Sequence, residues 1–148
     1  MQNLNFPNYT FRIKSTENIH YIFDVIRKKY VVLTPEEWVR QHVVHYLIYT
    51  KKFRQSYINV EKVFKINGIT KRYDIVVFDT DGSIYLLIEC KQPNVAISQD
   101  VFDQIARYNL KLNAKFLLVT NGLQHIYCKL DFEKQKYQFL QDIPLNIK

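Results

Sequence analysis

The fold expected for this chain follows from the stretch Asp74–Lys91, DIVVFDTDGSIYLLIECK. Two apolar runs, 74–78 and 84–91, flank the dipeptide Asp81-Gly82, and both runs are rich in β-branched residues. An Asp-Gly turn between such runs is a strong short-range signal for a β-hairpin. The sequence therefore predicts two adjacent antiparallel strands at the centre of the chain.

Charged residues stand at the ends of these otherwise apolar strands. Side chains alternate between the two faces of a strand, so Glu89 and Lys91 are expected on one face and Cys90 on the other. By the same alternation, Asp74 is expected to share its face with Val76. Charges in such places cost free energy unless they are paired or bind a metal ion. The acids and the lysine of the hairpin therefore need a partner or a function.

The amino-acid composition limits the classes of protein to which this chain can belong. The chain has 148 residues, of which 47% are hydrophobic and 15% aromatic; this excludes a disordered chain and predicts a single domain over residues 1–148. The net charge of +7 suits a polyanionic partner without proving one. No apolar run approaches the roughly 18 residues of a membrane helix, and the first residues do not resemble a signal peptide, so no membrane partner is expected. Cys90 and Cys128 are expected to be buried reduced thiols, which favours a cytoplasmic location.

An N-terminal extension, residues 1–33, precedes the expected core. Residues 1–19 predict an irregular arm or a short edge strand, residues 20–26 a strand, and residues 27–29 a basic turn. The first helix then begins at Thr34, an N-cap residue that is followed by a proline. Three apolar residues recur at helical spacing and predict that this helix continues to about residue 49–51: Val39, Val43 and Leu47.

The same signals place the other elements. A strand over residues 59–66 turns at Asn67-Gly68 into the central hairpin, and a second helix runs from the N-cap Ser98 to about residue 113. Further strands are expected at residues 115–119, 124–130 and 137–140. The order αβββαβ over a core at residues 34–130 predicts an α/β fold with a central mixed β-sheet flanked by helices.

The charged groups of the hairpin suit hydrolysis of a phosphodiester bond. A divalent cation held by carboxylates can activate water and neutralise charge that develops on the phosphate. Mg²⁺ takes oxygen ligands, commonly one or two carboxylates, and Asp74 and Glu89 on adjacent strands can supply them. The backbone carbonyl of Cys90 is a natural further ligand, and Lys91 can orient or deprotonate the attacking water.

These residues resemble the D…(D/E)-x-K signature of the PD-(D/E)xK nuclease superfamily. Asp74 and the tripeptide Glu89-Cys90-Lys91 carry the resemblance, although Tyr73 stands where the superfamily name has proline. The pair Gln104 and Tyr108 looks like the Q-x-x-x-Y motif of RecB-like members and of the N-terminal nuclease domain of type I restriction R subunits. The resemblance implies a restriction-endonuclease-like core in which Gln104 belongs to the catalytic site and Tyr108 contacts nucleic acid.

The helix that begins at Thr34 resembles the helix that carries one more active-site acid in those domains. Glu36 lies over the apolar stripe of the helix, and Glu37 stands where its carboxylate would complete a capping box with Thr34. We assign Glu36 to the site and Glu37 to the cap, and separate substitutions decide between the two.

The resemblance implies a nuclease dependent on Mg²⁺ or Mn²⁺, with DNA as its substrate. Nothing in the sequence separates DNA from RNA, or endonuclease from exonuclease action. Lys71 and Arg72 precede the first acid and are expected to contact phosphates. No helicase motor or glycine-rich phosphate loop is encoded in these 148 residues, and action as a homodimer or within a larger restriction or repair assembly stays open.

Structural alternatives account for the same residues. Asp74 can pair with Lys71 or Arg72, and Glu89 with Lys91, as ordinary surface ion pairs of small energetic value. The alternatives for the whole chain are a catalytically silent nucleic-acid-binding module and an assembly protein on the same fold. Two histidines three residues apart on the first helix, His42 and His45, lack an evident third ligand and are assigned to packing or to the surface.

Overall fold

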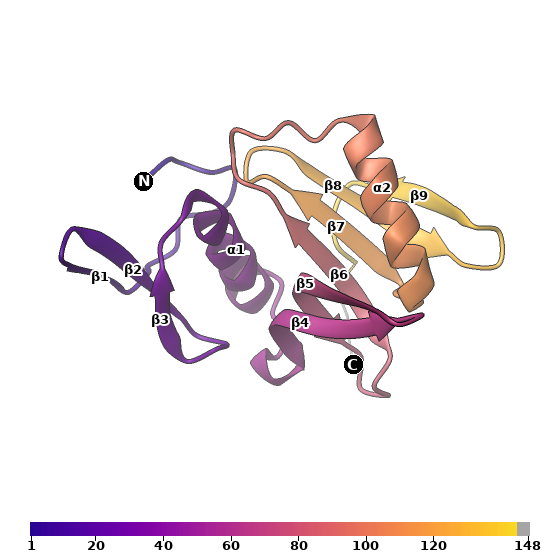
Figure 1. Cartoon of the computed structure of the whole chain (residues 1–148), viewed down its shortest axis with the longest axis horizontal. Helices are drawn as coiled ribbons and strands as arrows, with labels where there is room; N and C mark the ends of the chain where they lie inside the picture. The colour runs from indigo at the N-terminus through magenta and orange to yellow at the C-terminus, as the bar shows by residue number, and fades with distance from the viewer. Residues whose placement is uncertain (145–148) are drawn as a thin grey trace.

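The computed structural model describes residues 1–144 (Figure 1). Its helices and strands in chain order are β1 (Ile13–Thr16), β2 (Ile19–Asp24), β3 (Lys29–Val32), α1 (Pro35–His45), β4 (Ile58–Ile66), β5 (Ile69–Phe78), β6 (Ile84–Cys90), α2 (Gln99–Asn109), β7 (Phe116–Thr120), β8 (His125–Asp131) and β9 (Lys136–Leu140). A π-helix over Tyr46–Thr50 extends α1, and a short 3-10 turn over Leu110–Leu112 extends α2.

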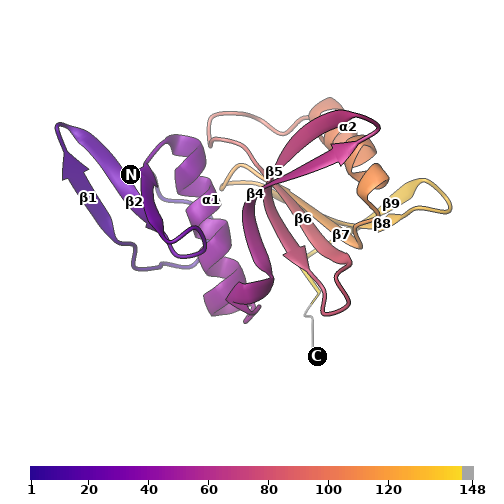
Figure 2. The same ribbon diagram turned by 60° about the horizontal axis from the view of Figure 1, so that its bottom comes forward.

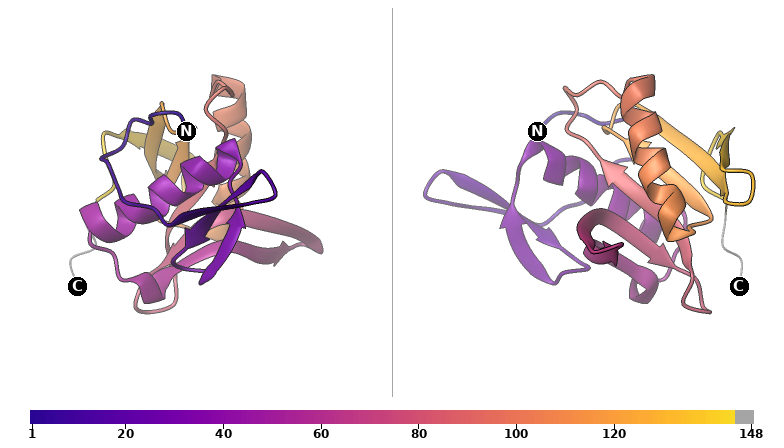
Figure 3. Two further views of the ribbon diagram at one scale, coloured as in Figure 1. Left: turned by 90° about the vertical axis from the view of Figure 1, so that its left-hand side faces the viewer. Right: turned by 45° about the vertical axis from the view of Figure 1, so that its right-hand side comes forward.

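Strands β4 to β9 form one mixed sheet in the order β4-β5-β6-β7-β8-β9. Strands β6 and β7 are parallel and joined through α2, and every other neighbouring pair is antiparallel. Helix α1 covers one face of this sheet and α2 covers the other (Figures 2 and 3). The α/β fold predicted from the sequence is therefore confirmed, and it is consistent with a restriction-endonuclease-like architecture.

The alternation of apolar side chains along β5 and β6 builds one core on each face of the sheet. Side chains that are almost inaccessible pack beneath α1, among them Val39, Val43, Leu47, Ile75 and Ile88. A second set packs beneath α2, among them Tyr73, Val76, Leu87, Phe102 and Ala106. The two free cysteines are buried, as expected, with Cys90 in the first core and Cys128 in the second.

Both helices begin where their N-caps predict. Thr34 Oγ1 accepts a hydrogen bond from the Glu37 N–H at 3.1 Å, and Ser98 Oγ accepts one from the Val101 N–H at 3.2 Å. The expected capping box is wrong in its second half. The Glu37 carboxylate binds two arginines instead, and the Thr34 N–H donates to the carbonyl of Val32 at 3.1 Å.

The N-terminal extension is more regular than the sequence indicated. Strands β1, β2 and β3 form a separate antiparallel sheet that lies on the far side of α1 from the main sheet (Figure 2). β2 already ends at Asp24, and the expected basic turn at residues 27–29 runs directly into β3. Glu17 and Asn18 both adopt left-handed φ angles, 53° and 67°, and form the tight β1–β2 turn.

The first residues of the chain pack across the outer side of α1 and are held there by hydrogen bonds. The Asn5 N–H donates to the carbonyl of Gly122 at 2.7 Å, beyond the end of β7. Gly122 has a φ of 87°, which favours glycine, and a Cβ on it would lie 2.9 Å from a methyl group of Leu4, so a larger residue would have to move the Leu4 side chain. Within residues 1–144, no helix combines the length and the hydropathy that crossing a lipid bilayer requires.

Candidate active site

Strands β5 and β6 separate at Asp74 and Glu89, the two acids predicted from the sequence. Their pairing ends at Ile75 and Ile88, so Asp74 and Glu89 lie just beyond the last pair. From there β5 continues beside β4, and this outer part of the hairpin bends toward α2 (Figure 2). Glu61, on β4 near this bend, has a left-handed φ of 56°.

The carboxylate of Asp74 fills the position where the strands separate. Its Oδ2 accepts the Cys90 N–H at 2.8 Å, a backbone group that would otherwise bond to a neighbouring strand. Its Oδ1 accepts from Nη2 of Arg40 on α1 at 2.6 Å. Asp74 therefore reaches the α1 side, whereas Val76 packs on the α2 side, and the expectation that they share a face is wrong.

Glu89 lies beside Asp74 in a buried position, with 8% of the residue exposed. Burial, and next the nearby negative charge of Asp74, raise the pKa of Glu89 to about 8. Within residues 1–144 its Oε1 is buried without a protein hydrogen-bond partner, and so is the hydroxyl of Tyr73. A buried, unsatisfied carboxylate oxygen beside a second carboxylate is a place where a cation or a water molecule can bind.

Lys91 follows directly after β6. Its backbone N–H donates to the Thr120 carbonyl on the neighbouring β7 at 2.8 Å, which fixes the direction of the chain there. The positive charge of Lys91 is near enough to offset part of the rise that burial and Asp74 cause in the pKa values of Glu89 and Glu36. Its ammonium group forms no ion pair within the part of the chain that the structure describes, so it remains available to a water molecule or an anion.

The two candidate helix acids have different surroundings. Burial and the charge of Asp74 raise the pKa of Glu36, whose side chain is 48% exposed and whose Oε2 lies 3.4 Å from Arg40 Nη2. Glu37 is buried: its Oε1 accepts from Arg27 Nη2 at 2.8 Å and from Arg40 Nη1 at 2.7 Å. Glu36 is therefore the glutamate that faces Asp74 and open solvent, and Glu37 belongs to a buried network.

That network joins the N-terminal sheet to Asp74, and it was not predicted from the sequence. Arg27 binds Asp24 at the end of β2 at 2.7 Å and Glu37 at 2.8 Å, and Arg40 binds Glu37 and Asp74. Asp24 is fully buried. The available signal was Arg40 itself, the single arginine of α1, three residues before the buried Val43.

The structure separates the expected nucleic-acid contacts. Lys71 Nζ lies 4.7 Å from the centre of the Tyr108 ring and 5.3 Å from that of Tyr73, so Lys71 faces α2. Arg72 is exposed and, by alternation, lies on the opposite face of the hairpin. Gln104 is exposed beside Tyr108 on the surface of α2 and forms no hydrogen bond to the acids within residues 1–144.

The oxygen ligands at this site meet only some of the requirements for binding a divalent cation. Asp74 and Glu89 offer two adjacent carboxyl groups, which is the number that a protein commonly provides to Mg²⁺. Arg40, however, already occupies Asp74 Oδ1. In the described part of the chain, no group of three or more His, Cys, Asp or Glu side chains is arranged as a ready metal site.

A mixed α/β fold with carboxylates where two central strands separate is consistent with a restriction-endonuclease-like domain. The family described as type I restriction enzyme R protein N terminus (HSDR_N) matches residues 35–144, and the chain belongs to this family. A search of curated proteins finds no match to the chain.

Proposed function

We propose that this protein is a PD-(D/E)xK-type nuclease that hydrolyses phosphodiester bonds of DNA with the help of Mg²⁺ or Mn²⁺. The observation that carries the proposal is the pair Asp74 and Glu89. Two carboxyl groups interact where β5 and β6 separate, and one buried oxygen of Glu89 has no hydrogen-bond partner among residues 1–144. Membership of the R-protein family supports DNA as the substrate and action together with other subunits.

Asp74, Glu89 and the Cys90 carbonyl are the groups that would hold the cation. When bound, a divalent cation lowers the pKa of water and withdraws charge from a phosphoryl oxygen. Cation binding also favours the ionised form of Glu89, whose pKa is raised in its absence. Glu36, across the site on α1, can accept a hydrogen bond from a water molecule there.

Lys91 places a cationic group near Glu89 and Glu36 that forms no ion pair within residues 1–144. An ammonium next to two carboxylates can orient the attacking water and stabilise the negative charge that develops on the phosphate. The backbone N–H of Lys91 donates to the Thr120 carbonyl on β7, and this hydrogen bond limits the positions that the Lys91 side chain can reach. We therefore assign Lys91 to catalysis, with Asp74 and Glu89 as metal ligands and Gln104 as a residue that reaches the substrate only when nucleic acid is bound.

Incubation with plasmid, linear and single-stranded DNA and with RNA tests the proposal. Each substrate is incubated with Mn²⁺ and with EDTA, using the wild type, Lys91→Ala and a matched control, Lys136→Ala, on the exposed edge strand β9. Cleavage that requires Mn²⁺, is lost in Lys91→Ala and is kept in Lys136→Ala is the expected result. Cleavage that persists in both variants, or in EDTA, contradicts it.

A second candidate function is a binding module that does not cleave. The observation that favours it is the 2.6 Å contact between Arg40 and Asp74, since this ion pair can replace a cation at the same carboxylate. This alternative expects DNA binding without cleavage and no Mn²⁺ binding in a calorimetric titration. Mn²⁺ binding that disappears in Asp74→Ala rules it out.

A further inference from the structure

The three-stranded sheet presents an aromatic and basic face that the proposed nuclease site does not use. This sheet lies outside residues 35–144, the part of the chain that the family matches, and it projects from the body on the far side of α1 (Figures 1 and 3). We propose that this face binds single-stranded nucleic acid by stacking unpaired bases on its partly exposed rings.

The register of the strands places the aromatic residues on one face. Phe23 pairs with Tyr30 across β2 and β3, and their ring centres lie 5.2 Å apart. Tyr21 lies two residues before Phe23 and therefore on the same face. The opposite face holds Ile22 and Asp24, which are both fully buried, so it is the inner face of the sheet. The three rings therefore lie on the outer face, where each is partly exposed.

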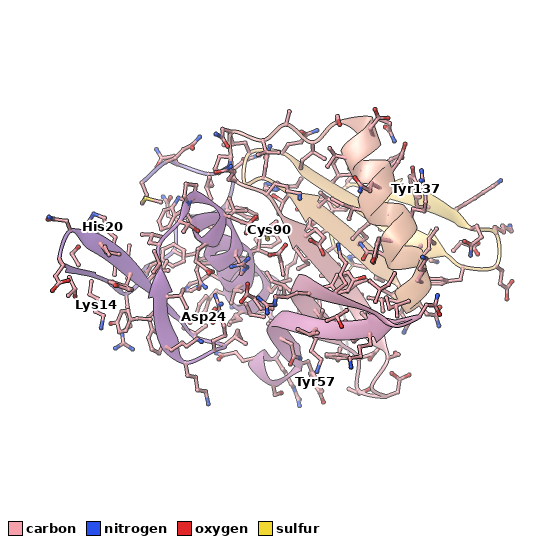
Figure 4. All side chains as sticks on the ribbon, viewed as in Figure 1. Lys14, His20, Asp24, Tyr57, Cys90 and Tyr137 are labelled. Atoms are coloured by element: carbon pink, nitrogen blue, oxygen red, sulfur yellow. The ribbon has the colours of Figure 1, made fainter. Side chains whose placement is uncertain are left out.

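Two cationic side chains, one from β1 and one from the residue before it, lie over the rings of Phe23 and Tyr30. The guanidinium carbon of Arg12 lies 4.5 Å from the centre of the Phe23 ring, and Lys14 Nζ lies 4.2 Å from that of Tyr30. Both cationic residues are exposed, and Figure 4 labels Lys14 on the projecting sheet. A guanidinium plane and an aromatic ring are both surfaces on which bases stack, and the flexible lysine can move to a phosphate.

The positive charge of this face indicates which kind of partner it can bind. By alternation and register, the face comprises Arg12, Lys14, Thr16, Ile19, Tyr21, Phe23, Tyr30 and Val32. Two of these side chains are cationic and none is acidic. Rings interleaved with cations match alternating bases and phosphates, whereas a duplex offers phosphates but no unstacked base. The complementary partner is therefore a single strand, of DNA or of RNA.

The buried network holds this face in a fixed relation to the acids. From the end of β2, ion pairs run through Asp24–Arg27 at 2.7 Å, Arg27–Glu37 at 2.8 Å and Glu37–Arg40 at 2.7 Å to Asp74 at 2.6 Å. In Figure 4, Asp24 lies between the projecting sheet and the rest of the molecule. Single-strand binding on this face does not require the acids to cleave, and the two activities can be tested separately.

Fluorescence anisotropy in EDTA, with the full chain, tests the inference. The probes are labelled oligo(dT), oligo(U) of equal length and a duplex of that length. Tyr30→Ala and Phe23→Ala are expected to weaken binding of single strands by roughly five- to one-hundredfold, the range that loss of base stacking causes. Tyr30→Phe keeps the ring and should bind like the wild type. Phe139→Ala, at an exposed ring on β9, is the matched control.

Three results overturn the inference. One is unchanged affinity for both single strands in Tyr30→Ala and Phe23→Ala. Another is an equal loss of duplex binding in these variants, because a duplex has no unpaired base to stack. The third is an equal loss in Phe139→Ala. If an alanine variant fails to fold by circular dichroism, the exposed Lys14→Glu and its control Lys134→Glu replace it, and only Lys14→Glu should weaken single-strand binding. Preference between oligo(dT) and oligo(U) then identifies the kind of strand.

Discussion

Arg40 Nη2 lies 2.6 Å from Asp74 Oδ1, so a buried guanidinium of α1 occupies the carboxylate that the proposed cation also needs. Arg40 also binds Glu37 at 2.7 Å and is itself only 5% exposed. Removal of one partner from a buried ion pair leaves the remaining charges without compensation. Arg40 therefore stabilises the protein as the structure shows it, and it would compete with the proposed cation for Asp74.

The first prediction concerns Arg40→Met. We expect the free energy of unfolding in EDTA to fall by about 3–5 kcal/mol, because Glu37 and Asp74 lose their common partner. Mn²⁺ should restore more stability to this variant than to the wild type, since the cation can take the place of the guanidinium at Asp74. Thermal unfolding with and without Mn²⁺ measures both effects, with the exposed Arg54→Met as control. Equal Mn²⁺ shifts in variant and wild type contradict the competition.

The second prediction separates the two glutamates of α1. Glu36→Gln should reduce cleavage at least about tenfold with little change in melting temperature, because Glu36 faces the site and its side chain is 48% exposed. Glu37→Gln should lower the free energy of unfolding by about 3–5 kcal/mol, because Glu37 is buried between Arg27 and Arg40. Cleavage rates and thermal unfolding of both variants are compared. The reverse pattern would assign the active-site acid to Glu37.

Local signals were sufficient for most of the fold. The Asp81-Gly82 turn, the N-caps Thr34 and Ser98 and the apolar periodicities each act over a few residues, and the elements they predict are present. The strand expected at residues 20–26 is present as β2, but its pairing with β1 and β3 into a sheet was not predicted. The turns of this sheet use non-glycine residues in the left-handed region, Glu17, Asn18 and Lys28, which composition does not reveal.

The surroundings of the site depended on contacts that are distant in sequence. Asp74 and Glu89 could be placed together from one hairpin, but the Arg40–Asp74 ion pair joins residues 34 positions apart. Alternation alone put Asp74 on the wrong face, because the strands separate there and the side chain turns toward α1. Sequence patterns describe regular strands, and the candidate site lies where the strands stop being regular.

The third prediction follows from the pKa of Glu89, which is raised from 4.5 to about 8 in the folded protein. The folded state holds a proton that the unfolded state releases, so this residue reduces stability as the pH rises from about 4.5 to about 8. Glu89→Gln removes the effect. In EDTA the melting temperature of the variant should exceed that of the wild type by a margin that grows with pH, to several degrees near pH 8, on the order of a few kcal/mol.

Thermal unfolding over this pH range checks the third prediction. The exposed Glu133→Gln, in the turn before β9, should show no such growing difference. A difference between Glu89→Gln and wild type that stays constant with pH would mean that Glu89 is ionised throughout. Since protons compete with cations at this carboxylate, Mn²⁺ binding to the wild type should also strengthen as the pH rises toward 8.

The fourth prediction concerns the contact between the N-terminal arm and α1. Burial lowers the pKa values of His42 and His45, so both favour the neutral form in the folded protein. Such groups contribute stability above the unfolded pKa of 6.5 that is lost as the pH falls below it. Trp38, the single tryptophan, packs against His42 at 4.4 Å between ring centres and donates its indole N–H to the carbonyl of Gln2 at 2.7 Å.

Acidification from about pH 7 to about pH 5 should therefore shift the Trp38 emission to longer wavelength as the arm detaches and water reaches the indole. In His42→Gln the midpoint of this shift should move to lower pH, while His20→Gln, at an exposed histidine on β2, should behave like the wild type. Emission that stays constant over this range in the wild type would show that protonation leaves the arm bound.

The fifth prediction distinguishes two basic neighbours on β5. Both Lys71 and Arg72 were expected to contact phosphates, but Lys71 Nζ lies 4.7 Å from the centre of the Tyr108 ring, whereas Arg72 is exposed. Each phosphate contact that is lost reduces the salt dependence of DNA binding by about one unit of slope. We therefore expect Arg72→Gln to weaken duplex binding and to flatten its salt dependence, and Lys71→Gln to change the slope little.

Dissociation constants for a labelled duplex at several KCl concentrations in EDTA provide the measurement. Lys134→Gln, in the exposed turn between β8 and β9 at the other end of the sheet from β5, is the matched control and should keep the wild-type slope. An equal change of slope in Lys71→Gln and Arg72→Gln would show that Lys71 leaves the Tyr108 ring when DNA binds. An unchanged slope in Arg72→Gln would place the duplex away from the outer half of β5.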